Sequence, residues 1–234
     1  GNKYIDFQNG WATNPIGNAH PEIIEAIHEA QKRYGFHYDH PLRYELAEKI
    51  TQITPEKALS RFNYEVSGTE AAESAFYMAM CYKKRRHVIT FASSFHGNSL
   101  GTKTFGGLNT RKYMEGWNGG AIIAPYPHSD HIPAGMTEEQ YSEYCLHYLE
   151  HHIPNYIAAK DNIAAIMVEP GLAEGGNWIP TKSFLQGIRA ICDRNDWLMI
   201  ADEVLTGLGR TAKMWAVEHY DVVPDILVIG KNLS

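Results

Sequence analysis

The apolar positions along the chain follow two patterns, which divide it into helices and strands. Apolar residues three or four positions apart, such as Ile23, Ile24 and Ile27 after Pro21, are typical of helices that bury one face. Helices are predicted over residues 21–35, 41–53, 69–85, 137–152 and 181–194. Short, almost continuously apolar runs bounded by turn residues are typical of buried strands. Strands are predicted over residues 61–66, 87–91, 120–124, 163–168, 197–201 and 226–229.

The alternation of these elements indicates the fold class. Apolar strands separated by helices are typical of a mainly parallel sheet with helices on both faces, so we predict an α/β fold. Residues 1–55 carry only helical patterns and are expected to form an N-terminal helical segment. Residues 56–234 are expected to form a large domain around the sheet. The glycine-rich stretch 92–119 has no regular pattern and is expected to be a functional loop.

The last predicted strand lies close to the final residue of the sequence. Residues 226–230 are apolar, and the sequence stops at Ser234. A buried strand needs covering elements. We therefore expect the sequence to be part of a longer protein, whose large domain continues on the C-terminal side.

Composition and charge argue against several classes of protein. The 234 residues are 44% hydrophobic and 21% charged, and the net charge of -6 leaves no basic footprint for nucleic acid. The N-terminal residues lack a signal-peptide pattern, and no apolar run has the length of a membrane span. Three widely spaced cysteines argue against a disulfide framework and for a reducing compartment. We expect a cytoplasmic protein without nucleic-acid or membrane partners.

The residues that follow the predicted strands are candidates for a site, because ligands of open parallel sheets bind at the carboxyl ends of the strands. These residues are Ser67, Gly68 and Thr69, the Phe95–His96–Gly97 region, Glu169, Asp202 and Lys231.

Two of these residues have related chemistry. Desolvation of Lys231 after an apolar strand disfavours its ammonium form and leaves a nucleophilic amine suited to aldehydes. Asp202 ends a buried strand and needs a cationic partner, for which a pyridinium nitrogen is suitable. Each residue also has an ordinary explanation, since lysines past strand ends are mostly exposed and aspartates often cap turns.

The other candidates suit the remaining parts of a flat, phosphorylated cofactor. A glycine at a helix N-terminus, as in Ser67–Gly68–Thr69, lets backbone amides approach a phosphate, although the same residues fit a plain helix cap. Phe95 can stack on a planar ring, or belong to the core.

Together these residues lie in stretches that resemble the class III pyridoxal 5'-phosphate (PLP)-dependent aminotransferases, including the 4-aminobutyrate, ornithine and ω-amino acid enzymes. The matching stretches are DFQNGWATNPIGNAHPEI (6–23), SGTEAAESA (67–75), SSFHGNSLGT (93–102), AAIMVEPGLAEGG (164–176), ADEVLTGLGRT (201–211) and PDILVIGKNLS (224–234). The most specific part is ADEVxTGxGR followed by PDIxxxGK. The resemblance covers essentially the whole chain.

The resemblance implies a role for each candidate residue. Lys231 would form the Schiff base with PLP and carry protons, and Asp202 would pair with the pyridine nitrogen. Gly68 and Thr69 would hold the phosphate, with Ser67 beside them.

Further roles follow from the same resemblance. Phe95 would stack on the cofactor ring, with His96 nearby. Glu169 and Glu174 would line the site, and Glu174 would hold or release a substrate-binding arginine. Leu205 stands where some members have a glutamine that reaches the phenolic oxygen of the cofactor.

The family resemblance also implies an activity and an assembly. The enzyme would move an amino group from an ω-amino acid or diamine to a 2-oxo acid, without a metal, as a homodimer. Family chains continue well beyond the lysine, with the rest of the large domain and a small C-terminal domain. Two alternatives stay open: a PLP-dependent aminomutase or racemase of the same family, and an inactive fragment or scaffold.

Three other motifs predict different functions. Residues 97–101 (GNSLG) fit a hydrolase nucleophile elbow, which needs a strand before it and a helix after it; the following sequence predicts no helix. Residues 207–212 (GLGRTA) fit a dinucleotide fingerprint but stand too far from the preceding strand, so we predict a turn. His147 and His151 have the spacing of a metal-binding pair, but we predict that they face solvent.

Overall fold

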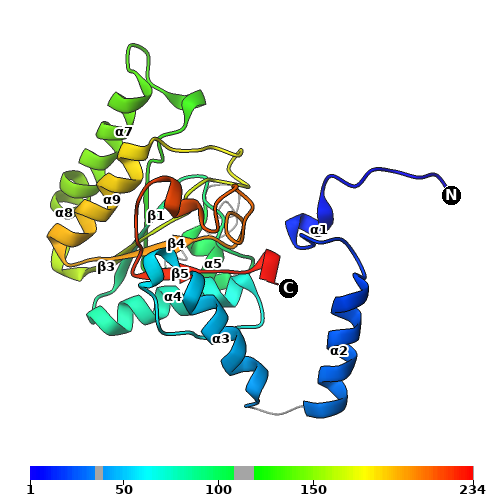
Figure 1. Cartoon of the computed structure of the whole chain (residues 1–234). Helices are drawn as coiled ribbons and strands as arrows, with labels where there is room; N and C mark the ends of the chain where they lie inside the picture. Colours follow the sequence, from blue (N-terminus) through cyan, green and yellow to red (C-terminus); the bar gives the residue numbers. More distant parts are fainter. Residues whose placement is uncertain (35–38, 108–118, 234) are drawn as a thin grey trace.

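A parallel sheet forms the centre of the computed structural model, which describes residues 1–34, 39–107 and 119–233 (Figure 1). Within these ranges the sheet has five strands in the order β2-β1-β3-β4-β5, and every neighbouring pair is parallel. The strands are β1 (His87–Phe91), β2 (Ala121–Ala124), β3 (Ile163–Val168), β4 (Leu198–Asp202) and β5 (Ile226–Val228). The α/β fold and these strand positions agree with the prediction from sequence.

Five helices lie close to their predicted positions: α2 (Pro21–Tyr34), α3 (Pro41–Ile53), α4 (Gly68–Lys83), α7 (Glu138–His147) and α9 (Lys182–Asn195). Three short helices were not predicted: α1 (Asn9–Ala12), α5 (Leu100–Phe105) and α8 (Ile153–Tyr156). A π-helical turn over Tyr148–His152 joins α7 to α8. Side-chain caps define the starts of α7 and α9 among others, because Thr137 and Thr181 accept backbone N–H groups there.

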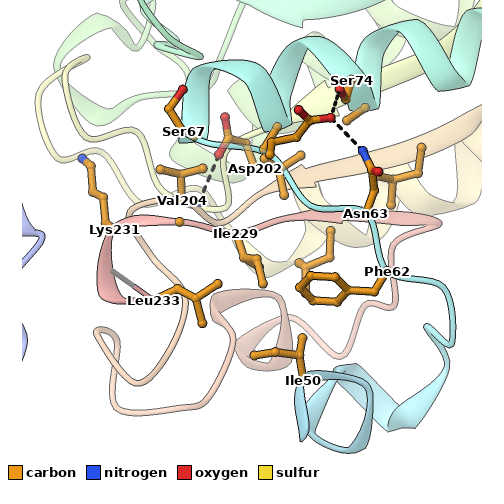
Figure 2. Close-up of a pocket in the computed structure, with 18 of the residues that line it drawn as sticks. Ile50, Phe62, Asn63, Ser67, Ser74, Asp202, Val204, Ile229, Lys231 and Leu233 are labelled. Carbon is orange, nitrogen blue, oxygen red and sulfur yellow. Dashed lines mark hydrogen bonds between the residues drawn. The ribbon is translucent and has the colours of Figure 1, made fainter. Parts of the chain in front are cut away.

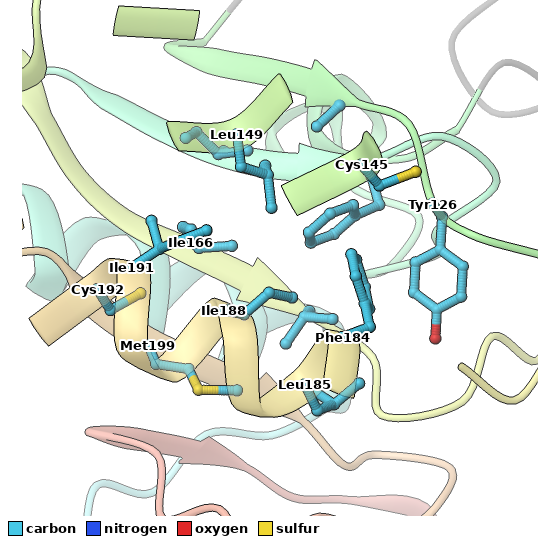
Figure 3. Packing of buried hydrophobic residues seen from close by; sticks show 14 of the residues in the cluster. Tyr126, Cys145, Leu149, Ile166, Phe184, Leu185, Ile188, Ile191, Cys192 and Met199 are labelled. Atoms are coloured by element: carbon cyan, nitrogen blue, oxygen red, sulfur yellow. The ribbon is translucent and has the colours of Figure 1, made fainter. Parts of the chain in front are cut away.

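Helices cover both faces of the sheet. On one face α7 and α9 form a core with alternate strand residues, as Figure 3 shows for Ile191 of α9 beside Ile166 of β3. On the other face the small residues of α4 pack against Met167 and Ile200. Successive residues of β3 point to opposite faces and all are buried. This explains why the strand is apolar throughout.

The amino ends of the strands are held together by a charged cluster. The Arg85 guanidinium donates to the Ile163 carbonyl oxygen (3.1 Å) and to the Asp196 carbonyl oxygen (2.8 Å), and it pairs with the Asp196 carboxylate at 3.0 Å. Lys83 Nζ lies 2.6 Å from the same carboxylate. The cluster therefore joins the segments that lead into β1, β3 and β4 at the edge of the sheet opposite to the predicted site.

The predicted strand at 61–66 is wrong. Among the described residues the segment pairs with no strand. It lines the same cavity as the edge strand β5, and Phe62 and Ile229 are both labelled there in Figure 2. A strand needs a neighbour that bonds its backbone, and no described segment pairs with it.

The prediction of a wholly irregular stretch at 92–119 is also wrong. Its described part contains α5, which Ser99 caps by accepting the Thr102 N–H at 3.1 Å. The buried Thr104 hydroxyl donates to the Gly101 carbonyl oxygen at 2.7 Å, so this polar group is satisfied within the helix. Residues 108–118 lie outside the described residues.

The N-terminal helix α2 lies apart from the sheet in Figure 1 and buries none of its residues. Its apolar stripe of Ile23, Ile24 and Ile27 is 42–47% exposed. No helix in the described ranges has both the length and the apolar character needed to cross a membrane.

Replacement of Phe184 tests the core under α9. The side chain is fully buried, and its ring lies 5.7 Å from that of Phe91 and 5.4 Å from that of Tyr126. We expect Phe184→Ala to lower the free energy of unfolding by about 3–5 kcal/mol, because it removes this packing and leaves a cavity. Urea unfolding followed by circular dichroism measures the change. The control is Tyr156→Ala, whose side chain is 77% exposed; equal midpoints for the two variants would contradict the described packing.

Candidate active site

A cavity of about 1000 Å³ extends from the carboxyl ends of β1, β3 and β4 along the length of the edge strand β5. The chain order reverses between β1 and β3, and the connections that leave these neighbouring strands diverge there to form a crevice. Every site residue predicted from the sequence lines this cavity: Ser67, Gly68, Thr69, Phe95, His96, Glu169, Glu174, Asp202, Leu205 and Lys231. Figure 2 shows Ser67, Asp202 and Lys231 around one end of it.

Close packing around Val204 brings three segments together. A Cβ at Gly68 would lie 2.9 Å from Val204 Cγ1, and a Cβ at Gly230 would lie 3.2 Å from the same atom. The latter would also be 3.6 Å from the Gly68 Cα. Glycine permits this approach because it has no side chain. The contact places the start of α4 beside the residue that precedes Lys231.

The start of α4 presents hydrogen-bond donors to the cavity. The Ser67 hydroxyl accepts the Glu70 N–H (3.3 Å), and the Ser67 carbonyl oxygen accepts the Ala71 N–H (3.0 Å). Within the described residues, the Gly68 and Thr69 N–H groups have no acceptor. Two such amides at the positive end of a 16-residue helix suit an anion such as phosphate.

Asp202 and His96 form a buried pair. Nδ1 of His96 lies 2.7 Å from Oδ2 of Asp202, and Oδ1 of Asp202 accepts the Val204 N–H at 3.1 Å. Burial opposes the charged imidazolium, but the hydrogen bond and charge of Asp202 outweigh it and raise the pKa of His96. Nε2 of His96 is buried and has no hydrogen-bond partner in the described part of the chain.

Glu169 is a third ionisable group in this buried region. Its Oε1 accepts the Phe95 N–H at 2.7 Å, which fixes the backbone that carries the Phe95 ring. Burial raises the pKa of Glu169 to about 7, although the neighbouring His96 acts in the opposite direction. The carboxyl group therefore changes its charge near neutral pH.

The remaining predicted residues are more accessible. Lys231 and Leu205 are half-buried, and Glu174 is exposed beyond the end of β3. Lys231 begins the short 3-10 turn η6 (Lys231–Leu233), and its φ of 43° lies in the left-handed region.

Sequence reasoning did not identify the pair of His96 and Asp202 or the packing role of Val204. The paired residues are separated by 106 positions, so no local pattern connects them. The need of a buried Asp202 carboxylate for a cationic partner was the available signal, and among the described residues His96 meets it.

The competing motifs do not form the sites that they predict. A helix follows Ser99, so the predicted absence of one was wrong, but β1 already ends at Phe91 and the Ser99 hydroxyl is bonded to Glu73 and Thr102. A nucleophile elbow needs the strand directly before the serine. Residues 207–212 form turns, as predicted. His147 and His151 are both exposed, with ring centroids 4.7 Å apart.

The match to a protein family agrees with this arrangement. The model of the class-III aminotransferases matches residues 1–234. The chain belongs to this family. It is 32% identical over 241 residues to a probable 4-aminobutyrate aminotransferase of Bacillus subtilis and 34% identical over 247 residues to an acetylornithine aminotransferase of Agrobacterium fabrum. In both comparisons all of this chain is matched, and it covers 55% of the relative.

Solved aminotransferases have the same fold. The taurine:2-oxoglutarate aminotransferase of Bifidobacterium kashiwanohense, in complex with PLP and glutamate, matches with a TM-score of 0.92 and 28% identity. A PLP-bound amine transaminase from an uncultivated Pseudomonas species matches with a TM-score of 0.91 and 27% identity. The first match includes 100% of this chain and 53% of the solved protein. The second includes 98% of this chain and 54% of the solved protein. This family member thus spans about half the length of its relatives.

A change at Glu169 tests the buried charge cluster. Its raised pKa means that the folded state holds this proton more tightly than the unfolded state, whose pKa is near 4.5. The free energy of unfolding should therefore fall as the pH rises from about 4.5 to 7, by on the order of 3 kcal/mol for this group. His96, whose pKa is also raised, adds a loss in the same direction above pH 6.5.

We expect Glu169→Gln to reduce this loss and to make the protein more stable than the wild type at pH 8. Urea unfolding at pH 5 and pH 8 measures both values. Glu174→Gln is the matched control, because Glu174 is on the same loop and exposed. If the free energy of unfolding falls equally with pH in the wild type and in Glu169→Gln, the pKa of Glu169 is not raised by burial.

Proposed function

We propose that this chain is the cofactor-binding part of a PLP-dependent aminotransferase that moves an amino group from an ω-amino acid or diamine to a 2-oxo acid. Lys231 is the residue proposed to bind the aldehyde carbon of PLP. The observation that carries the proposal is the meeting of Lys231, Asp202, Phe95 and the start of α4 in one cavity.

The residues present suit the separate parts of PLP. The Gly68 and Thr69 N–H groups without acceptors offer a cradle for the phosphate. Asp202 offers a buried carboxyl group, the kind of partner that a pyridinium nitrogen would need. The Phe95 side chain lines the same cavity, and a face of its ring suits a planar heterocycle. The buried Nε2 of His96 adds a polar atom without a partner in the described residues.

The proposed roles divide the chemistry between cofactor and protein. PLP would supply an electron sink for the carbon that bears the transferred amino group. Nζ of Lys231 is the base that accepts the proton from this carbon, and the same atom later delivers a proton. Asp202, with Nδ1 of His96 2.7 Å from its Oδ2, supplies a buried carboxyl group to the cavity. Glu174 stands exposed, where it can pair with a cation near the substrate.

The substrate classes are proposed from the relatives. The names of two relatives include 4-aminobutyrate and acetylornithine, and one structural relative is named for taurine and 2-oxoglutarate. In 4-aminobutyrate and taurine the amino group is not on the carbon that bears the acidic group, and acetylornithine contains a second nitrogen. Half-buried Leu205 adds an apolar surface to the cavity wall.

The assembly and location belong to the same proposal. We propose a homodimer, which the exposed isoleucine stripe of α2 supports. The division into an N-terminal helical segment (1–55) and a PLP-binding domain (56–234) is supported by the absence of buried residues in α2. Free thiols at Cys81, Cys145 and Cys192 support a cytoplasmic location.

Chemical trapping tests the role of Lys231. The protein is incubated with PLP, so that Nζ adds to the aldehyde carbon and water leaves, and borohydride then reduces the carbon–nitrogen double bond. We expect peptide mass spectrometry to find the label on Lys231, and to find none at this position in Lys231→Ala. Lys160→Ala, which changes an exposed lysine, should label as the wild type does.

The result also separates the proposal from its alternatives. A wild-type protein with no label on Lys231 would contradict the cofactor assignment. A label without amine transfer from 4-aminobutyrate or ornithine to 2-oxoglutarate would favour an inactive fragment. Rearranged or racemised amino acid products would favour an aminomutase or racemase.

A further inference from the structure

Lys231 is one of fourteen described residues other than glycine with a positive φ. Its φ of 43° is in the left-handed region, which residues with a side chain adopt at a cost in free energy. Such strain persists only where the surrounding structure enforces it, and it is found at functional sites. Within the described residues, the Leu233 N–H donates to the Gly230 carbonyl oxygen at 3.2 Å and closes the turn. Contacts with neighbouring segments add to this bond.

The side chain of Asn232 supplies such contacts. Its Nδ2 donates to the Gly207 carbonyl oxygen at 3.2 Å and to the Leu208 carbonyl oxygen at 3.4 Å. Both acceptors belong to the loop that follows β4. Asn232 therefore fastens the Lys231 turn to the segment that also carries Asp202 and Leu205.

This loop is a firm support because a buried glutamate organises it. Glu203 is 1% exposed, and its carboxylate accepts the N–H groups of Ala216 and Val217 and the hydroxyl of Thr206, all at 2.8 Å. A Cβ at Gly207 would lie 2.9 Å from the fully buried ring of Trp215. The Gly207 backbone thus has little room to move.

Arg210 fixes the orientation of the Asn232 amide. Its Nη2 donates to Oδ1 of Asn232, which leaves Nδ2 directed at the two carbonyl groups. The same guanidinium donates to the Leu205 carbonyl oxygen at 2.8 Å and to the Ala12 carbonyl oxygen at 2.6 Å. It therefore joins the N-terminal segment, the loop after β4 and the Lys231 turn.

We propose that Asn232, oriented by Arg210, is a positioning residue that holds the strained Lys231 backbone so that Nζ can reach the aldehyde of PLP. Asn232 acts through Lys231 and is not itself proposed to contact the cofactor. This inference rests on the proposed function, since it assumes that Lys231 reacts with PLP.

The test compares the rate at which borohydride traps PLP on Lys231. Asn232→Ala and Asn232→Asp both lose the two Nδ2 donors, and the aspartate variant keeps the size of the side chain and the acceptor for Arg210. We expect trapping to be about tenfold slower in both, the size expected for loss of hydrogen bonds of this kind. Arg210→Lys keeps a cation that can donate to Asn232 but loses the separate guanidinium nitrogens that bond Leu205 and Ala12, so we expect a smaller decrease.

Three measurements separate positioning from a general loss of structure. Thermal unfolding of the cofactor-free proteins should give similar midpoints, and the visible absorbance band of the PLP complex should titrate at a different pH in the Asn232 variants. Asn155→Ala and Arg33→Lys, at exposed positions on α8 and α2, are matched controls and should trap at the wild-type rate. If Asn232→Ala does not fold, Asn232→Asp decides the result.

The outcomes distinguish this inference from the proposed function. Wild-type trapping on Lys231 at the same rate as in the Asn232 variants would overturn the positioning role alone. A slower rate that simply follows a lower unfolding midpoint would also overturn it. No wild-type label on Lys231 would overturn the proposed function, and the positioning role with it.

Discussion

The close approach of Gly68 and Gly230 to Val204 is the contact on which the site depends. One glycine begins α4 and the other precedes Lys231, and side chains at either position would crowd Val204. Parallel strands bring their carboxyl ends to one edge of the sheet, but they do not fix the distances between the loops that follow them. The glycine contact sets the distance between the amides that suit a phosphate and the turn that carries the amine. The remaining site residues are arranged around this junction.

The sequence predicted most of the fold because the central strands are apolar on both faces. β1 and β3 have the predicted bounds, and a run such as IAAIMV has few other stable arrangements. The predicted strand at 61–66 failed because a short sequence pattern describes a local preference, whereas a strand exists only with a partner. α5 was missed for a different reason: its stability depends on the Ser99 cap and on burial of Thr102 and Phe105, which a propensity argument does not include.

The list of site residues was predictable, but their interactions were not. Family motifs identify positions one by one, and all of those positions line the cavity. His96 pairs with Asp202, which is far from it in the sequence. Asn232, beside Lys231, bonds to the loop that follows β4, a contact that depends on how that loop folds. The buried cluster of Glu169, His96 and Asp202 also has an energetic consequence. It keeps ionisable groups where burial opposes their charge, which costs folding free energy at neutral pH and is typical of functional sites.

The charged cluster of Arg85, Lys83 and Asp196 lies at the amino ends of the strands, and the cavity lies at their carboxyl ends. The sheet therefore lies between two regions with separate tasks. The contacts that join the segments leading into β1, β3 and β4 are at one end of the strands, and the residues that line the cavity are at the other. A substitution in the charged cluster thus changes no side chain of the cavity wall.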